Sequence, residues 1–227
     1  MTQHVYFFGD GTAEGGIAMK PILGSKGANL AEMANLGVPV PPGFTLSTRV
    51  CLEYLESRSL PDAVRAEIRE AVARLERVTG RTFGGQPRPL LVSVRSGAAV
   101  SMPGMMDTIL NLGLNDVTAE ALAAESGNAS FAYDSYRRLV QMYGDVVCGL
   151  KAQPGEADPF EAGLEAAKRA HGVTREIDLP AATLRQLVGQ FKGMVARSTG
   201  EGFPHDAWDQ LWGAIEAVFL SWQNRRA

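Results

Sequence analysis

Residues 95–115 read "RSGAAVSMPGMMDTILNLGLN" and directly follow the apolar run "LLVSV" at residues 90–94. A short, continuous apolar run of this kind predicts a buried strand, so residues 95–115 would leave the end of that strand. A plain connection is usually shorter and more polar. The glycines, the proline and the three methionines therefore indicate a loop shaped around a phosphate, a nucleotide or a neighbouring domain.

Upstream of this loop, the patterns predict a mixture of strands and helices. Residues 5–8 ("VYFF") predict a strand, and residues 38–44 ("VPVPPGF") contain too much proline for a central strand and predict an extended segment or a sheet edge. Three helices are predicted by apolar spacing and by caps. Their markers are Ala28, Leu30, Met33 and Leu36 ending before Gly37; a start at Ser47 or Thr48; and Val64, Ile68, Ala71, Leu75 and Val78 between Pro61 and Gly80.

From about Val117 onward, almost every pattern is helical. Asp158–Glu161 ("DPFE") has the form of a capping box with proline at the first helical position. The helices are marked by apolar residues at helical spacing: Phe131, Tyr136, Leu139, Val140, Tyr143, Val146 and Val147; Leu184, Leu187, Val188, Phe191 and Val195; and Trp208, Leu211, Ile215, Val218 and Trp222. The first half of the chain is therefore expected to be α/β or α+β and the second half nearly all helical.

The composition is that of an ordinary globular protein. The 227 residues are 45% hydrophobic and 21% charged, with a formal net charge of −3 and a pI of about 5.7, which argues against a dedicated nucleic-acid binder. No signal peptide and no apolar stretch long enough to cross a bilayer is evident, so we expect a cytoplasmic protein without membrane contact. Cys51 and Cys148 lie in apolar helical patterns and are expected to be small buried hydrophobic residues.

Lys26 stands between glycines in "GSKGANL" (residues 24–30), where a helix is expected to begin. Backbone N–H groups at a helix start favour an anion, and Gly24 and Gly27 would allow a phosphate to approach closely. Lys26 would add a mobile positive charge. The alternative is an exposed lysine in a helix-start loop, because the motif differs from the common phosphate-binding loop.

Arg95 follows the predicted buried strand, and strand ends open into clefts in many mixed folds. Its guanidinium could bind a phosphate with two hydrogen bonds, or it could pair with a carboxylate at the edge of the core. In residues 101–108, Gly104 permits unusual backbone angles, and the methionines could contact a purine, a neighbouring domain or the core. His4, His171 and His205 are far apart and have no metal-ligand partner at suitable spacing, so no metal site is expected in this chain.

Four stretches, taken in order, resemble the N-terminal nucleotide-binding region of the pyruvate, phosphate dikinase family. They are residues 24–44 ("GSKGANLAEMANLGVPVPPGF"), 90–116 ("LLVSVRSGAAVSMPGMMDTILNLGLND"), 131–147 ("FAYDSYRRLVQMYGDVV") and 214–227 ("AIEAVFLSWQNRRA"). Phosphoenolpyruvate synthases share the lysine loop and the "PVPPGF" turn but differ after "VRS". The resemblance covers nearly the whole chain.

The resemblance implies an ATP-grasp-like fold with an all-helical insertion and without the subdomain that closes over ATP. Residues 1–116 would form the α/β subdomain, residues 117–200 the helical subdomain, and residues 201–227 a helix returning to the first subdomain. The composition change near Val117 agrees with this division.

The resemblance also assigns ATP-binding residues. Lys26 matches the family's phosphate-binding lysine and Arg95 its ATP-binding arginine. Gly104 lies in the loop expected to cover the phosphates, with Ser101 and Thr108 as further candidates. Two positions depart from the family pattern: Ser25 replaces a glycine of "GGKG", and Ala99 stands where some members carry arginine.

Family members convert ATP, phosphate and pyruvate to AMP, pyrophosphate and phosphoenolpyruvate, and they use magnesium. We expect this chain to be an inactive N-terminal piece of such an enzyme, with no catalytic residue and no magnesium ligand of its own. Its partners would be ATP, the swivelling domain that carries the phosphorylated histidine, and the pyruvate-binding barrel, in a homo-oligomeric parent. The alternative is a non-catalytic regulatory or interaction module that docks through the methionine-rich loop or the helix from Trp208 to Trp222.

Overall fold

The structure is a computed structural model, which describes residues 3–97, 108–152, 155 and 157–223. The chain divides into two compact units. Unit 1 takes in Met1–Arg81, Arg95–Met106 and Val218–Ala227, and unit 2 takes in Thr82–Val94 and Asp107–Ala217. Both units combine helices with small sheets, so the α+β class predicted from the sequence is confirmed.

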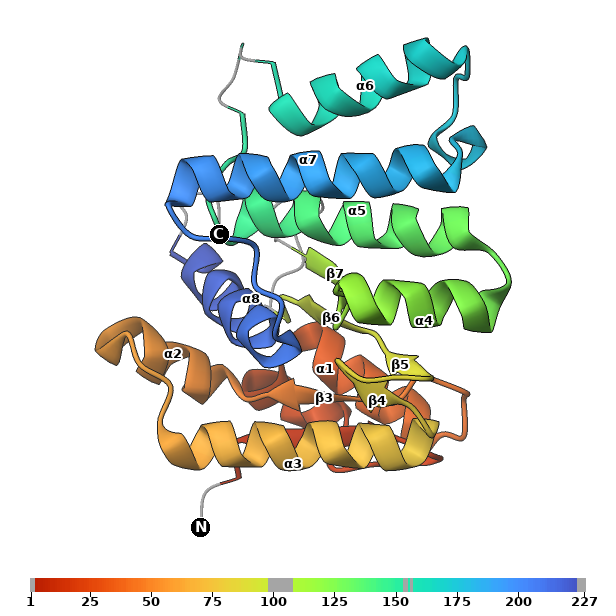
Figure 1. Cartoon of the computed structure of the whole chain (residues 1–227). Helices are drawn as coiled ribbons and strands as arrows, with labels where there is room; N and C mark the ends of the chain where they lie inside the picture. The colour runs from red at the N-terminus through yellow and green to blue at the C-terminus, as the bar shows by residue number, and fades with distance from the viewer. Residues whose placement is uncertain (1–2, 98–107, 153–154, 156, 224–227) are drawn as a thin grey trace. The chain divides into compact units, whose positions relative to one another are not determined.

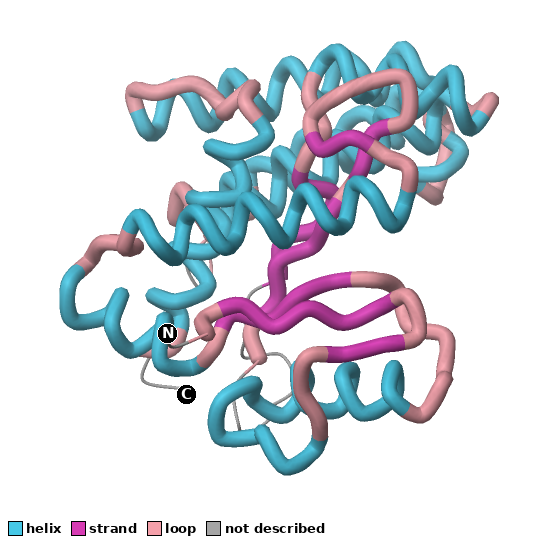
Figure 2. The backbone as a smooth tube through the Cα atoms, turned by 90° about the horizontal axis from the view of Figure 1, so that it is seen from below, coloured by secondary structure: helices cyan, strands magenta, loops and turns pink. Residues whose placement is uncertain are grey.

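Unit 1 is built on a three-stranded antiparallel sheet with β1 in the middle (Figure 2). Its strands are β1 (Val5–Gly9), β2 (Thr12–Ala13) and β3 (Gly43–Leu46). The strand predicted at residues 5–8 is confirmed, and its side chains Val5, Phe7 and Phe8 are buried. The proline-rich stretch precedes β3, which lies at the edge of the sheet as predicted.

Three helices pack in unit 1, and two of them, α1 and α3, contact β1. They are α1 (Lys20–Asn35), preceded by the short 3-10 helix η1 (Ile17–Met19), α2 (Thr48–Ser57) and α3 (Asp62–Thr79). Gly80 ends α3 with a left-handed backbone, as predicted, and Ser47 stands at the start of α2 without making a side-chain capping bond. The sequence therefore predicted the end of α3 and the start of α2 correctly, but the capping hydrogen bond expected at the start of α2 is not formed by Ser47.

The predicted apolar face of α1 was partly wrong. Met33 and Leu36 are exposed, at 40% and 72%, whereas Ala28, Ala31 and Ala34 are buried. A Cβ atom on Gly27 of the same helix would lie 2.8 Å from the Thr45 side chain of β3. Helix α1 thus approaches the sheet through its small residues, and apolarity alone did not distinguish that close face from the exposed one.

Unit 2 contains two two-stranded sheets: β4 (Thr82–Phe83) with β5 (Pro89–Leu90), and β6 (Val92–Arg95) with β7 (Thr108–Leu112). The predicted buried strand at residues 90–94 is therefore divided between β5 and β6. Within β6, Val92 and Val94 are only half-buried and Ser93 is exposed. Strand β6 is therefore not enclosed on both faces, as the apolar run suggested it would be.

The rest of unit 2 is helical, as predicted. Figure 1 shows α5 and α7 side by side, with α4 against α5 and α6 against α7. The apolar residues predicted for α7 are all buried, and Phe191 of α7 packs edge-on against Phe160 of α6 at 5.0 Å. The elements are α4 (Asp116–Ser126), α5 (Ala129–Val146), α6 (Pro159–His171), η2 (Glu176–Asp178), α7 (Ala181–Thr199) and α8 (Ala207–Ser221), whose last residues belong to unit 1.

Helix α6 begins where the sequence placed it. The Asp158 side chain accepts hydrogen bonds from the backbone N–H groups of Phe160 and Glu161, at 2.8 and 3.1 Å, and Pro159 occupies the first helical turn. These bonds satisfy two N–H groups that the helix itself leaves without partners.

Asp145, near the end of α5, has one carboxylate oxygen that is buried without a hydrogen-bond partner among the described residues. Burial, and then the charge of Asp158, raise the pKa of Asp145 to about 6. The folded-state pKa lies above the unfolded value, so the folded chain binds more protons between about pH 4 and pH 6, and stability falls as pH rises through this window.

We therefore expect Asp145→Asn to change the pH dependence of stability. Relative to the unsubstituted chain, the variant should gain about 1 kcal/mol between pH 4 and pH 7, a value reduced for the partial exposure of the carboxylate. Chemical denaturation at both pH values measures this gain. An equal difference in unfolding free energy at the two pH values would contradict it.

Both cysteines are free thiols. Cys51 is buried in α2 as predicted, and burial raises its pKa to about 12. Cys148 follows α5 rather than lying within a helix, and it is only half-buried, so the prediction was correct for one cysteine and incomplete for the other. Within the part of the chain that the structure describes, no helix is long and apolar enough to cross a membrane.

Candidate functional site

Helix α1 is interrupted at Gly24, four residues after its start. Gly24 has φ 68° and ψ 173°, far from helical values, so a second helical segment begins immediately after it. Backbone N–H groups at such a start have no partner within the helix and can bind an anion. Lys26 lies in this first turn and its side chain is exposed.

The backbone of Gly97 lies directly against Gly24. A Cβ atom placed on Gly24 would be 1.5 Å from the Gly97 carbonyl oxygen, so only glycine allows this approach. Gly97 is two residues beyond Arg95, and Gly24 is two residues before Lys26. The fold of unit 1 therefore brings together the two segments that carry these predicted site residues.

This packing corrects the role predicted for the glycines of the lysine loop. The space beside Gly24 is taken by Gly97, and the space beside Gly27 is taken by the Thr45 side chain. Their missing side chains allow parts of the same chain to pack closely. Any phosphate would have to approach the backbone N–H groups from another direction.

Lys26 and Arg95 are both exposed, and neither forms an ion pair with any other residue that the structure describes. The alternative considered for Arg95, a pair with a carboxylate at the core edge, is therefore not seen within the described chain. Two exposed cations on adjoining segments, beside a helix start, form an arrangement suited to an anion.

The other predicted site residues are less informative. Ser101 and Gly104 lie outside the described residues. Thr108 is the first residue of β7, half-buried, and belongs to unit 2, whereas Lys26 and Arg95 belong to unit 1. The sequence predicted a loop as far as residue 115 and missed this strand, whose burial does not follow the alternation typical of a strand. Its buried residues, Ile109 and Leu112, are three positions apart, and Asn111 between them has a positive φ of 63°.

The sequence named Trp222 as part of the last helix but did not predict its contact with Ser96. The indole Nε1–H of Trp222 donates a hydrogen bond of 2.9 Å to Ser96 Oγ, and Ser96 is only 2% exposed. Ser96 lies between Arg95 and Gly97, so this bond reaches the segment that contacts Gly24. Nothing in the local pattern around either residue predicts a contact across 126 positions.

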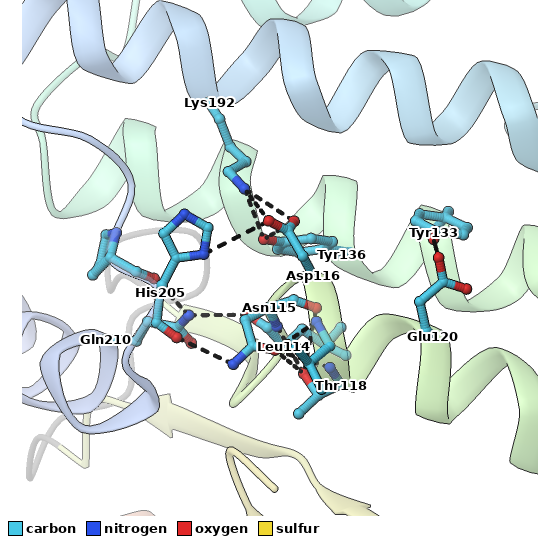
Figure 3. A network of polar contacts seen from close by, with 12 residues as sticks. Leu114, Asn115, Asp116, Thr118, Glu120, Tyr133, Tyr136, Lys192, His205 and Gln210 are labelled. Atoms are coloured by element: carbon cyan, nitrogen blue, oxygen red, sulfur yellow. Dashed lines mark hydrogen bonds and ion pairs between the residues drawn. The ribbon is translucent and has the colours of Figure 1, made fainter. Parts of the chain in front are cut away.

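A separate polar cluster lies in unit 2, around Asp116 at the start of α4 (Figure 3). The Asp116 carboxylate accepts two hydrogen bonds of 3.0 Å from Lys192 Nζ and one of 3.1 Å from the Tyr136 hydroxyl, and His205 Nδ1 lies 3.7 Å away. Burial raises the pKa of Asp116, but the bond and charge of Lys192 outweigh it, and the pKa is lowered. These partners saturate the carboxylate, so the cluster joins α4, α5 and α7 and leaves little capacity for a ligand.

Unit 2 also contains a cavity of about 550 Å³. It is half-open, and its polar lining includes Tyr143, Cys148, Thr199, Glu201 and Asp209. Among the described residues, no group of three or more histidine, cysteine, aspartate or glutamate side chains could hold a metal ion. The cavity therefore presents two carboxylates without a metal-ligand set.

The described chain is thus an α+β protein in which unit 1 exposes a lysine and an arginine beside an interrupted, glycine-containing helix start. The family model described as "Pyruvate phosphate dikinase, AMP/ATP-binding domain" matches residues 20–71 and 53–227. The chain belongs to this family, which confirms the resemblance seen in the sequence.

Curated relatives agree with this assignment. The chain is 51% identical over 228 residues to pyruvate, phosphate dikinase of Rhizobium meliloti, and 51% identical over 227 residues to pyruvate, phosphate dikinase 2 of Zea mays. It is 48% identical over 229 residues to pyruvate, phosphate dikinase of Clostridium symbiosum. Each match covers 100% of this chain and 25% of the relative, so the chain spans about a quarter of the length of these proteins.

Proposed function

We propose that the chain binds the phosphates of ATP at the second helical segment of α1, as the N-terminal nucleotide-binding part of a pyruvate, phosphate dikinase. The observation that carries the proposal is the contact between Gly24 and Gly97, because it places the segment that contains Lys26 against the segment that contains Arg95. Family membership supports an adenine nucleotide as the ligand.

In this proposal the two cations have different tasks. Arg95 would bind phosphate oxygens with two parallel hydrogen bonds, which fixes their orientation. The ammonium group of Lys26, on its flexible side chain, would pair with the negative charge of the phosphates. The backbone N–H groups after Gly24 would donate hydrogen bonds to the same oxygens. Ser101, Gly104 and Thr108 remain proposed contacts, and Gly104 would belong to a loop covering the phosphates.

The whole protein would convert ATP, phosphate and pyruvate to AMP, pyrophosphate and phosphoenolpyruvate. Its fold would be ATP-grasp-like, with residues 117–200 as the helical insertion. The swivelling phosphohistidine domain and the pyruvate-binding barrel would be its partners in a cytoplasmic homo-oligomer. Magnesium would arrive with ATP, and the described residues do not offer a set of ligands for it.

Titration calorimetry of MgATP into the chain tests the proposal. We expect a dissociation constant in the high micromolar range or weaker, because the proposed contacts are limited to two cations, a few backbone groups and the three further residues Ser101, Gly104 and Thr108. Lys26→Ala and Arg95→Ala should each weaken binding by about tenfold or more, since each removes a charge-assisted hydrogen bond.

Two exposed cations serve as matched controls. Arg49, which pairs with Glu53 on its own helix, and Lys151 of unit 2 are not proposed to contact the nucleotide, and each can be replaced by alanine. We expect both controls to bind MgATP like the unsubstituted chain. Equal weakening by the controls and by the site variants would reduce the effect to net charge and would overturn the proposal, as would the absence of binding.

A further inference from the structure

We propose that Trp222 is a positioning residue for the phosphate site, acting through its hydrogen bond to Ser96. This inference rests on the proposed function and adds a residue that lies 126 positions from its partner. Trp222 is assigned no contact with the nucleotide. Its task is to hold the backbone segment that carries Arg95 and Gly97.

The first step is the bond itself. Ser96 Oγ accepts the indole N–H at 2.9 Å, and the 2% exposure of Ser96 keeps water from replacing this donor. A buried hydroxyl that loses its partner is costly, so the bond constrains the side chain of Ser96 and therefore the backbone on both sides of it.

The second step connects that backbone to the site. The residue before Ser96 is Arg95, and the residue after it is Gly97, whose carbonyl oxygen lies on Gly24. Displacing Ser96 would shift the Cα atom of Arg95, from which its side chain extends, and would loosen the contact between Gly97 and Gly24. A shift of about 1 Å is enough to disturb two parallel hydrogen bonds to a phosphate.

The third step is the anchoring of Trp222. The end of α8 is held on α2 by a contact between the rings of Phe219 and Tyr54, with centroids 5.6 Å apart. Next to Trp222, Gln223 Oε1 accepts a hydrogen bond of 2.8 Å from Arg58 at the end of α2.

Helix α2 is in turn bonded to α1 at its other end, where the Thr48 hydroxyl donates to the Pro21 carbonyl at 2.8 Å. The segment that carries Trp222 is therefore anchored on α2, and α2 is bonded to α1 three residues before Gly24.

The experiment compares Trp222→Phe, Ser96→Ala and the double variant in MgATP titrations of the chain, with a thermal melt of each variant without nucleotide. Phenylalanine keeps most of the ring and removes only the N–H donor. We expect Trp222→Phe to weaken binding about three- to tenfold, the range expected for the loss of one hydrogen bond from a buried acceptor. Ser96→Ala should have a smaller effect on affinity, because the indole N–H of the half-buried Trp222 can then donate its hydrogen bond to water.

The double variant supplies the test of coupling. If both residues act through one bond, the double variant should bind no more weakly than Trp222→Phe alone. The melting temperatures should fall by no more than a few degrees, the range expected for the loss of one buried hydrogen bond. Affinities are compared at a temperature where every variant is folded, so that a role confined to stability would move the melt and leave the affinity of the folded chain unchanged.

A second signal comes from fluorescence. Trp222 is the one tryptophan in the sequence that falls in unit 1, because Trp208 and Trp212 belong to unit 2. We expect MgATP to change the tryptophan emission of the chain, and this change should be lost in Trp222→Phe and kept in Trp208→Phe. Trp208→Phe is also the matched control for affinity, since Trp208 lies at the start of α8 and Trp222 directly follows the end of that helix.

The outcomes separate the two proposals. If the chain binds MgATP and Lys26→Ala abolishes binding, while Trp222→Phe and Ser96→Ala leave it unchanged, the positioning role is overturned and the proposed function stands. If the unsubstituted chain does not bind MgATP, the proposed function is overturned and the positioning role falls with it. Additive losses in the double variant would also overturn the role, because the two residues would then act independently.

Discussion

Replacing Gly24 with alanine should disrupt the contact between Gly24 and Gly97 at the candidate site and abolish nucleotide binding. The new Cβ would lie 1.5 Å from the Gly97 carbonyl oxygen and 2.6 Å from the Gly97 carbonyl carbon, both of them backbone atoms that cannot turn aside. The backbone of Gly24, with φ 68° and ψ 173°, is also in a region that other residues rarely adopt. We expect unit 1 to lose about 3 kcal/mol or more of stability, and MgATP binding to fall below detection.

Two further glycines separate the causes of this loss. Gly37 has φ 76° with no atom within 4 Å of an added Cβ, so Gly37→Ala measures backbone strain alone, expected to cost about 1 kcal/mol. Gly189 lies inside α7, also with open space around it, so Gly189→Ala should be neutral or stabilising by up to about 1 kcal/mol. Denaturant melts and MgATP titrations of the three variants provide the comparison. A Gly24→Ala chain as stable as Gly37→Ala would show that Gly97 can move away, and the contact on which the proposed site depends would be refuted.

The second large effect is expected in unit 2, at Arg137 on α5. Its side chain is only 2% exposed and makes four hydrogen bonds: two to Asp134 Oδ1, at 3.0 and 2.8 Å, one to Gln141 Oε1 at 2.8 Å, and one to Glu176 Oε2 at 3.2 Å. Glu176 belongs to η2, so this arginine joins η2 to α5. Arg137→Ala would leave a cavity, and Asp134 Oδ1 would lose both of the hydrogen bonds that it accepts from the guanidinium. Glu176 Oε2 would keep its bond from Arg138. We expect a loss of about 3 kcal/mol of unfolding free energy.

Arg138 provides a control on the same two carboxylates. It pairs with Asp134 Oδ2 at 2.9 Å and with Glu176 Oε2 at 3.1 Å, but its side chain is 53% exposed. Exposed ion pairs contribute little, so Arg138→Ala should cost less than about 1 kcal/mol. Urea unfolding of both variants measures the difference. Equal losses would mean that burial of the guanidinium does not determine the strength of these pairs, and the prediction would be wrong.

The helices of unit 2 were the most predictable part of the fold. Each buries one face against its neighbours, so apolar residues recur at helical spacing, and α7 is an example in which every marked residue is buried. Helix ends were predictable where a local motif supplies the bond, as at Asp158, or the left-handed turn, as at Gly80. These features depend on residues within a few positions of one another.

Predictions failed where packing or pairing between distant segments decided the outcome. The run at residues 90–94 looked buried, but Val92 and Val94 of β6 are only half-buried and Ser93 is exposed. Met33 and Leu36 looked like core residues, but close approach to the sheet required the alanines of α1. Apolarity signals that a side chain can be buried, whereas its neighbours decide whether it is.

The sequence by itself determined the family, the α+β class, most helices, and Lys26 and Arg95 as candidate phosphate ligands, because these depend on residue type, local spacing and motif. Only the tertiary structure decided that Gly24 meets Gly97, that Trp222 bonds to Ser96, and that Arg137 is buried among its acceptors. The physical reason is that such contacts join backbone and side-chain atoms from segments that no periodicity relates, so they exist only once the chain has packed.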